Sequence, residues 1–278
     1  MNVLSGLITL ENHYLTKEYS DVCYNILKEP IRFHRKQWEN VYVIQMLKLK
    51  NFTNSNSKGI SFGSGKGIEI KALANLGCKL TVTDLNESDA KELGWVDTNQ
   101  HTTNLDSFKD DRFDNFDYLN NLEIDNNVDM NNIPSKYLQG DYDFVTSVCA
   151  LEHLGSLRHG LEFIKNSINC VKVGGIVVHT TELNINSLYK NYDGKTIEHK
   201  LTSVYRAKDL KILKEEVEQL GHKMYEMDYT YGNGLYDKYI DLPPYPGNDT
   251  NKHLRLELHD GLLKIPATCV GIVIERLI

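Results

Sequence analysis

The glycines Gly63, Gly65 and Gly67 stand between a short apolar run and a segment of helical periodicity. Ile60–Phe62 is typical of a buried parallel strand, and Ile68–Leu76 is followed by a glycine, as helices often are. Glycines in such a turn let the backbone approach a ligand without side-chain clashes. This order of strand, turn and helix predicts a binding site for a nucleoside cofactor.

A second predicted strand, Lys79–Thr83, ends in Asp84, about 20 residues beyond the glycine turn. An acid at this position can accept hydrogen bonds from ribose hydroxyls. The glycines follow G-x-G-x-G, whereas the dinucleotide fingerprint G-x-G-x-x-G would place its third glycine at Ile68. The spacing therefore argues against a dinucleotide, and an NAD(P)-dependent reductase stays an alternative only.

Polar residues also follow two later predicted strands, where ligands of open α/β sheets bind. His153 comes soon after Tyr142–Val148, while His179 and Glu182 lie at the end of Ile176–Thr180 and just beyond it. Imidazole and carboxylate groups can accept a proton, so His153, His179 and Glu182 are the candidate catalytic residues. Two alternatives remain open. His179 or Glu182 can face a helix instead, or the three side chains can ligate a metal ion together.

The alternation of strands and helices predicts an α/β fold with a doubly wound, mostly parallel sheet. Helices are expected over Leu157–Val171 and Ala207–Leu220, and the last two strands over Lys223–Tyr229 and Thr268–Glu275. Residues 1–57 are interpreted as a helical extension and residues 58–278 as the ligand-binding domain.

The extension carries apolar residues at helical spacing in two segments. These predict helices over Tyr19–Lys28 and Gln37–Leu49.

A long polar insertion separates the last two predicted strands, over about residues 232–266. Long irregular segments in compact domains are often functional loops. Tyrosine, histidine and arginine side chains can stack on a polar ring and hydrogen-bond to it. The candidate substrate-binding residues are Tyr236, Tyr245 and His253 of the insertion, together with Tyr205 and Arg206, which precede it in the chain. A structural flap or a subunit contact is the alternative for the insertion.

Composition restricts the class of protein. The chain has 278 residues and a net charge of -7, which argues against a bulk electrostatic grip on nucleic acid. Its five cysteines are scattered and odd in number, which predicts reduced thiols and a cytoplasmic location. No apolar run reaches the roughly 18 residues that a membrane helix needs, so no membrane association is expected.

Longer segments resemble a known family. They are GWVDTNQH (Gly94–His101), CALEHLGSLRHGLEFI (Cys149–Ile164), VGGIVVHTTE (Val173–Glu182) and YRAKDL (Tyr205–Leu210). With the glycine turn and Asp84, they resemble class I S-adenosylmethionine (SAM) methyltransferases, particularly bacterial ones encoded among surface-polysaccharide and glycosylation genes. The resemblance covers most of the chain from Gln37 onward and implies a seven-stranded Rossmann-like sheet. One residue departs, because many members carry an acid where this chain has Ser61.

The resemblance implies SAM as the cofactor and S-adenosylhomocysteine as its product. It also implies that an N-terminal helix forms a lid over the cofactor, so the helix over Gln37–Leu49 is either this lid or a layer against the sheet edge. The implied cofactor-binding residues are Gly63, Ser64, Gly65, Gly67, Asp84, Leu85, Asp129, Met130 and Cys149. The expected reaction is methyl transfer to an oxygen of a small polar acceptor, such as a saccharide, a nucleotide sugar or another capsule precursor. Alternatives are N-methylation of an amino sugar and a non-catalytic SAM- or nucleotide-binding partner subunit. No metal is expected, although one is not excluded, and the oligomeric state is not predicted.

Overall fold

The computed structural model describes residues 1–98, 100–102, 104–113, 115–189, 194–199 and 201–278. The strands of its central sheet are β1 (Gly6–Ile8), β2 (Lys58–Ser61), β3 (Lys79–Thr83), β4 (Leu122–Asp125), β5 (Tyr142–Val148), β6 (Val171–Asn184), β9 (Lys223–Met224), β10 (Met227–Asp228), β11 (Arg255–Asp260) and β12 (Leu263–Glu275). They follow the order β10-β1-β12-β6-β5-β2-β3-β4, and β9 and β11 also pair with β12. Strands β2 to β6 run parallel, whereas β12 is antiparallel to β6. The predicted doubly wound, mostly parallel sheet is confirmed.

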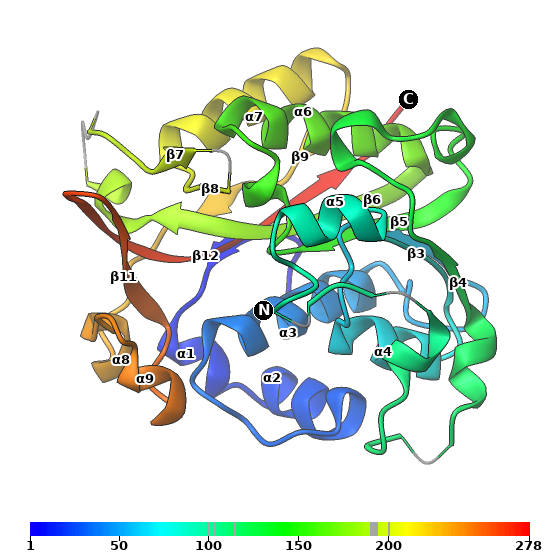
Figure 1. The fold of residues 1–278 in the computed structure, drawn as a ribbon, viewed down its shortest axis with the longest axis horizontal. Coiled ribbons are helices and arrows are strands. Elements are labelled where there is room, and N and C mark those ends of the chain that lie inside the picture. Colours follow the sequence, from blue (N-terminus) through cyan, green and yellow to red (C-terminus); the bar gives the residue numbers. More distant parts are fainter. Residues whose placement is uncertain (99, 103, 114, 190–193, 200) are drawn as a thin grey trace.

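Helices cover both faces of this sheet (Figure 1). Their bounds are α1 (Glu11–Tyr14), α2 (Lys17–Asp21), α3 (Arg35–Leu49), α4 (Ile68–Asn75), α5 (Glu87–Glu92), α6 (Leu157–Ser167), α7 (Ala207–Gln219), α8 (Leu235–Lys238) and α9 (Pro246–Asp249). On one face, Phe163 of α6 and Leu213 of α7 join a buried apolar cluster with Val177. On the other, Ile70 of α4 joins a second cluster with Val178. Burying a side chain of this size stabilises the fold by roughly 1.5–3 kcal/mol.

Strand β6 is longer than the sequence predicts. Its residues pair with β12 from Ile176 opposite Glu275 to Asn184 opposite Ala267, so the strand continues well past Thr180. Helix α6 is shorter than predicted, because a 3-10 turn follows it and β6 begins at Val171. The extra length of β6 carries its polar end residues to the edge of the candidate site.

The N-terminal segment contributes a strand as well as helices. Strand β1 pairs antiparallel with β12, Leu7 opposite Gly271, and parallel with β10, Gly6 opposite Met227. The strand predicted over Lys223–Tyr229, the first of the last two, is therefore two short strands, β9 and β10, because β1 lies between β10 and β12. The sheet thus exceeds the expected seven strands.

Helix α2 of this segment is followed by a π-helical turn over Val22–Leu27, where one helix was expected. Helix α3 begins two residues before its predicted start, and the imidazole Nδ1 of His34 accepts the N–H of Lys36 at 3.1 Å as its cap. The start of α3 points its first side chains toward β6 and β12.

The insertion at 232–266 is only partly irregular. It contains α8 and α9, and its last third forms the β11–β12 hairpin, with Arg255 opposite Thr268. A separate two-stranded element joins β7 (Glu198–His199) to β8 (Thr202–Ser203). Among the helices in the described ranges, none is long and apolar enough to span a membrane.

Candidate cofactor and acceptor site

A cavity of about 580 Å³ lies beyond the carboxyl ends of β2, β3 and β5, the sheet edge where ligands of open α/β folds bind. Its volume is in the range of small-molecule sites. The sequence-predicted residues that line it are Gly63, Ser64, Gly65, Asp84, Leu85, Asp129, Met130, Cys149 and His153. The fold therefore brings together eight of the nine expected cofactor residues and one expected catalytic residue.

The glycine turn forms one wall of this cavity and leaves no room for side chains. Gly63 and Gly65 have φ of 57° and 50°, in the left-handed region that favours glycine. A Cβ on Gly65 would lie 2.6 Å from the carbonyl oxygen of Gln100. Gly67 does not line the cavity; it precedes α4, and a Cβ there would collide with the Glu69 carboxylate. The start of helix α4 thus explains why the residue at position 67 lacks a side chain.

Asp84 ties the end of β3 to the glycine turn. Its carboxylate accepts the N–H of Gly65 at 3.1 Å and the N–H of Leu85 at 2.9 Å. A carboxylate has about four acceptor positions, and the backbone of Thr102 also bonds to this one, so at least one position remains for a ligand hydroxyl. Burial raises the pKa of Asp84 above its usual range. Ser61 lies beneath this turn, where its carbonyl oxygen accepts hydroxyls from Ser64 at 3.0 Å and Thr83 at 2.9 Å.

The cavity has a second wall that the sequence did not assign. Its additional lining residues include Glu92, Leu93, Trp95, Gln100 and His101, from α5 and the segment after it. His101 Nε2 donates to the Leu85 carbonyl at 2.8 Å, since that oxygen can only accept. The available signal was the motif GWVDTNQH, which resembles the family but carries no spacing that identifies a role.

His153 closes the cavity next to Trp95, with ring centroids 4.6 Å apart. Its Nδ1 donates to the carbonyl oxygen of Leu201 at 2.6 Å. In the neutral ring, Nε2 is therefore the unprotonated nitrogen and can accept a proton.

The side chains of β6 alternate between the two helical layers. Val177, His179 and Thr181 face α6 and its neighbours, whereas Thr180 and Glu182 face the start of α3. This alternation separates the two β6 residues that the sequence proposed as catalytic.

His179 lies in the core, outside the cavity. Its ring is completely buried, hydrogen-bonded to Ser147 Oγ at 2.8 Å and Ser167 Oγ at 3.1 Å, and packed against Phe163. Burial lowers its pKa to about 3, which keeps the ring neutral. The expected acceptor-facing position of His179 is corrected to a structural one.

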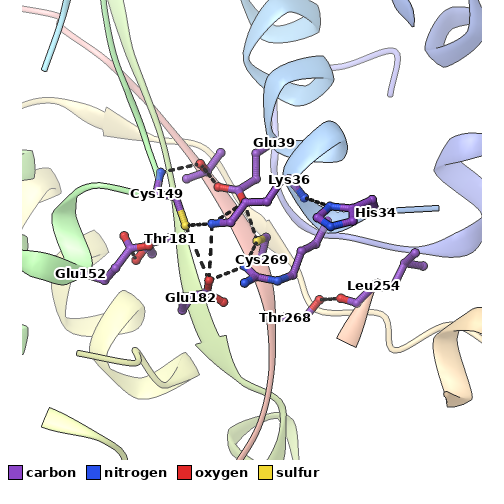
Figure 2. Close-up of polar contacts among 12 residues, drawn as sticks. His34, Lys36, Glu39, Cys149, Glu152, Thr181, Glu182, Leu254, Thr268 and Cys269 are labelled. Carbon is purple, nitrogen blue, oxygen red and sulfur yellow. Dashed lines mark hydrogen bonds and ion pairs between the residues drawn. The ribbon is translucent and has the colours of Figure 1, made fainter. Parts of the chain in front are cut away.

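Glu182 lies in a polar cluster next to the cavity (Figure 2). Its carboxylate forms an ion pair with Arg35, lies 3.7 Å from Lys36 Nζ and accepts the Cys149 thiol at 3.5 Å. Burial raises the pKa of Glu182, but Arg35 and Lys36 outweigh burial and hold that pKa below its usual value. Glu182 is therefore an anion fixed by two cations.

Two other acids complete this cluster. Glu39 of α3 accepts the Thr180 hydroxyl at 2.5 Å and the Cys269 thiol at 2.8 Å. Glu152 accepts the Thr181 hydroxyl at 3.1 Å, and burial raises its pKa. Glu152 belongs to the segment CALEHLGSLRHGLEFI, and the sequence assigned it no role.

A metal ion has one candidate ligand set in the described ranges. One ligand atom each of Cys149, Glu152 and Glu182 lie within 4.8 Å of one another. Arg35 and Lys36 also supply positive charge at Glu182. The set combining His153, His179 and Glu182 does not form, because His179 lies in the core.

The expected substrate-binding residues make internal contacts. Tyr205 is fully buried, and its backbone pairs with that of Glu182. Arg206 forms the cap of α7 with Asp209, and Tyr236 stacks on a phenylalanine of the N-terminal segment. These three residues therefore hold elements together and do not line the cavity.

The remaining two lie where the insertion meets α3. The Tyr245 hydroxyl donates to the Glu257 carbonyl at 3.0 Å, and His253 Nδ1 contacts Asp241 at 2.6 Å. The His253 carbonyl accepts the N–H of Arg35 at 3.0 Å. The insertion thus fixes the position of Arg35 in the cluster.

Comparison with known proteins decides the family. The family model for the methyltransferase domain matches residues 35–221, more than half of the chain. The chain belongs to this methyltransferase family. The match begins at Arg35, so the family domain includes α3, and its end at residue 221 leaves out the insertion and β12.

Solved structures give a weaker comparison for the methyltransferase. A SAM-dependent methyltransferase from Methanosarcina mazei is 13% identical, with coverage of 83% of this chain and 97% of that one and a TM-score of 0.45. The methyltransferase domain of bacterial CtHen1 is 15% identical, with coverage of 87% and 100% and a TM-score of 0.47. An O-methyltransferase family protein from Burkholderia thailandensis is 13% identical, with coverage of 96% and 70% and a TM-score of 0.43. No curated protein matches.

The methyltransferase is therefore an enzyme of a SAM-dependent family. Its cavity fits that cofactor: the glycine wall admits a ligand only because Cβ atoms are absent, and Asp84 offers a free acceptor position at the adjacent strand end. When bound, SAM supplies a methyl group on a positively charged sulfur. The protein contributes binding and orientation.

Proposed function

We propose that this methyltransferase transfers the methyl group to an oxygen of a small polar acceptor. A saccharide, a nucleotide sugar or another surface-glycan precursor is the acceptor class. The observation that carries the proposal is the contact between the cavity and the polar cluster at Cys149. This residue lines the cavity, and its thiol also reaches Lys36 and Glu182.

The cofactor side is assigned from the cavity wall. Asp84 would hold the ribose hydroxyls, and Asp129 and Met130 the adenine, while the glycine turn admits the amino-acid portion. Asp129 caps the following 3-10 turn through the N–H of Asn131 at 2.8 Å, which fixes the carboxylate beside the cavity. The resemblance to class I methyltransferases supports these roles.

The acceptor side is assigned to the cluster at the start of α3. Methyl transfer needs the acceptor atom in line with the bond that breaks, so most of the acceleration comes from positioning. A hydroxyl oxygen forms the new bond to the methyl carbon as the carbon–sulfur bond breaks, and the hydroxyl proton passes to a base. Of the expected catalytic residues, His153 presents a basic nitrogen at the cavity and Glu182 an anion beside it.

A panel assay tests this proposal. Purified enzyme with SAM is offered free sugars, nucleotide sugars and matched deoxy sugars, and S-adenosylhomocysteine release is measured. We expect release with one sugar class and a new O-methyl signal by NMR in the product. Release that occurs only with acceptors lacking hydroxyls would contradict the proposal.

N-methylation of an amino sugar is the second candidate. The observation that favours it is the position of the Lys36 ammonium, which contacts the Glu39 and Glu182 carboxylates at 3.3 Å and 3.7 Å. A cluster that accommodates one amine can accommodate another. Amino sugars in the same panel decide between the candidates, because the product then carries an N-methyl group.

A further inference from the structure

The Lys36 side chain is more exposed than the two acids that it contacts. Its side chain is 42% exposed, whereas those of Glu39 and Glu182 are 0% and 7% exposed. The ammonium lies against Cys149 Sγ, beside both carboxylates (Figure 2). A flexible lysine stem allows the ammonium to leave this position without moving α3.

Two carboxylate oxygens of this cluster have no hydrogen-bond partner in the described structure. They are Oε1 of Glu152 and Oε2 of Glu182, in residues that are 1% and 6% exposed. Leaving a buried acceptor unsatisfied costs about 1–3 kcal/mol. A ligand that brought hydrogen-bond donors to these oxygens would relieve this cost.

The charges of the cluster favour the same kind of ligand. With the Lys36 ammonium displaced, Glu182 would keep its ion pair with Arg35, whereas Glu39 would lose the ion pair that it makes with Lys36. A carboxylate or phosphate at this position would meet like charges, whereas an amine or hydroxyl would donate to them.

We propose that the nucleophilic group of the acceptor, a hydroxyl or an amine, binds where the Lys36 ammonium lies, and that Lys36 swings outward to admit it. This inference rests on the proposed function and adds the position of the acceptor group and the residue that covers it. Cys149 belongs to both the cavity and the cluster, so a group at this position adjoins the cofactor.

Replacement of the lysine by a small residue tests the inference without knowledge of the natural acceptor. Lys36→Ala leaves the space of one alkylammonium, and ethylammonium chloride is the probe. Binding is measured by calorimetry with and without S-adenosylhomocysteine. Lys48→Ala, at the exposed far end of α3, is the matched control. Lys36→Ser serves if the alanine variant does not fold.

We expect ethylammonium to bind Lys36→Ala at least about tenfold more tightly than the wild type or Lys48→Ala, because the side chain no longer competes. Tetramethylammonium, which has no N–H donor, should bind the three proteins with equal affinity. A crystal structure of the variant with ethylammonium and S-adenosylhomocysteine should place the ammonium between Glu39 and Glu182. Equal binding of ethylammonium to all three proteins, or an ammonium found elsewhere, would overturn the inference.

The same samples separate this inference from the proposed function. If SAM binds the wild type but ethylammonium does not prefer Lys36→Ala, only the inference fails. If SAM does not bind the wild type, the proposed function fails, whereas the ethylammonium titration in cofactor-free protein still tests the position of the donor site.

Discussion

The Asp84 carboxylate accepts the backbone N–H of Gly65 at 3.1 Å, and this bond joins the end of β3 to the turn after β2. The carboxylate is therefore oriented before any ligand arrives. An acceptor held in place by the backbone loses little freedom on binding, which favours tight cofactor binding.

Replacement of Gly65 by alanine should weaken both the fold and the cofactor site. The left-handed backbone alone costs about 1–2 kcal/mol for a residue with a Cβ. The added carbon would also press on the Gln100 carbonyl across the cavity. We expect SAM affinity to fall by at least about tenfold, which corresponds to 1.4 kcal/mol, measured by calorimetry.

Gly94→Ala is the matched control for that change. Gly94 also has a positive φ, of 83°, but a Cβ there would meet no atom within 4 Å. Gly94→Ala should lower the free energy of unfolding in urea, because of the left-handed backbone at this residue, without a comparable loss of SAM affinity. Equal losses of affinity in both variants would contradict the role assigned to Gly65.

His179 should make stability depend on pH. Its pKa is about 3 in the folded protein, against an ordinary value of 6.5, so the unfolded chain binds the proton more readily. The stability linked to the neutral ring is fully present above pH 6.5 and is lost as pH falls toward 3. At pH 5 the loss is about 2 kcal/mol, at about 1.4 kcal/mol per pH unit below 6.5.

His179→Gln removes this titration. The difference in unfolding free energy between wild type and His179→Gln should shrink by about 2 kcal/mol from pH 7 to pH 5, in urea titrations. A difference that stays constant over this range would show that the buried neutral ring is not the cause. SAM affinity of the variant should stay unchanged, since His179 does not line the cavity.

Arg35→Met should destabilise the enzyme through Glu182. The Arg35 guanidinium and the Glu182 carboxylate are both buried, so removal of the cation leaves an uncompensated anion. Such a loss typically costs about 3–5 kcal/mol, whereas the exposed pair of Lys211 and Glu215 should contribute less than about 1 kcal/mol. Urea unfolding of Arg35→Met and Lys211→Met measures both. A cost for Arg35→Met as small as that of the exposed pair would mean that Lys36 alone compensates Glu182.

The local parts of the cofactor site could be predicted from the sequence. Glycine spacing and an acid at the next strand end are properties of short segments, and they placed Gly63, Gly65 and Asp84 correctly at the cavity. Gly67 belongs to the same motif but lies outside the cavity. It precedes α4, where a Cβ would collide with the Glu69 carboxylate.

The parts that depend on distant pairing could not be predicted. Which face of β6 a residue occupies depends on the phase of the strand against α3 and α6, so His179 and Glu182 looked equivalent in the sequence although only Glu182 reaches the cluster. Strand β1 has three residues, and only its pairing with β10 and β12 makes it a strand. The position of the Lys36 ammonium in the cluster likewise depends on how α3 packs against β6.

Titration of SAM into wild type and Asp84→Ala tests the central claim most directly. Calorimetry should show one site in the wild type and a loss of about hundredfold or more in the variant, since hydrogen bonds to a charged group contribute about 1.5–3 kcal/mol each. Circular dichroism should confirm that the variant is folded, and Asp125→Ala, at the end of β4 and outside the cavity, should bind normally. SAM binding of equal strength in wild type and folded Asp84→Ala would contradict the assignment of the cofactor site.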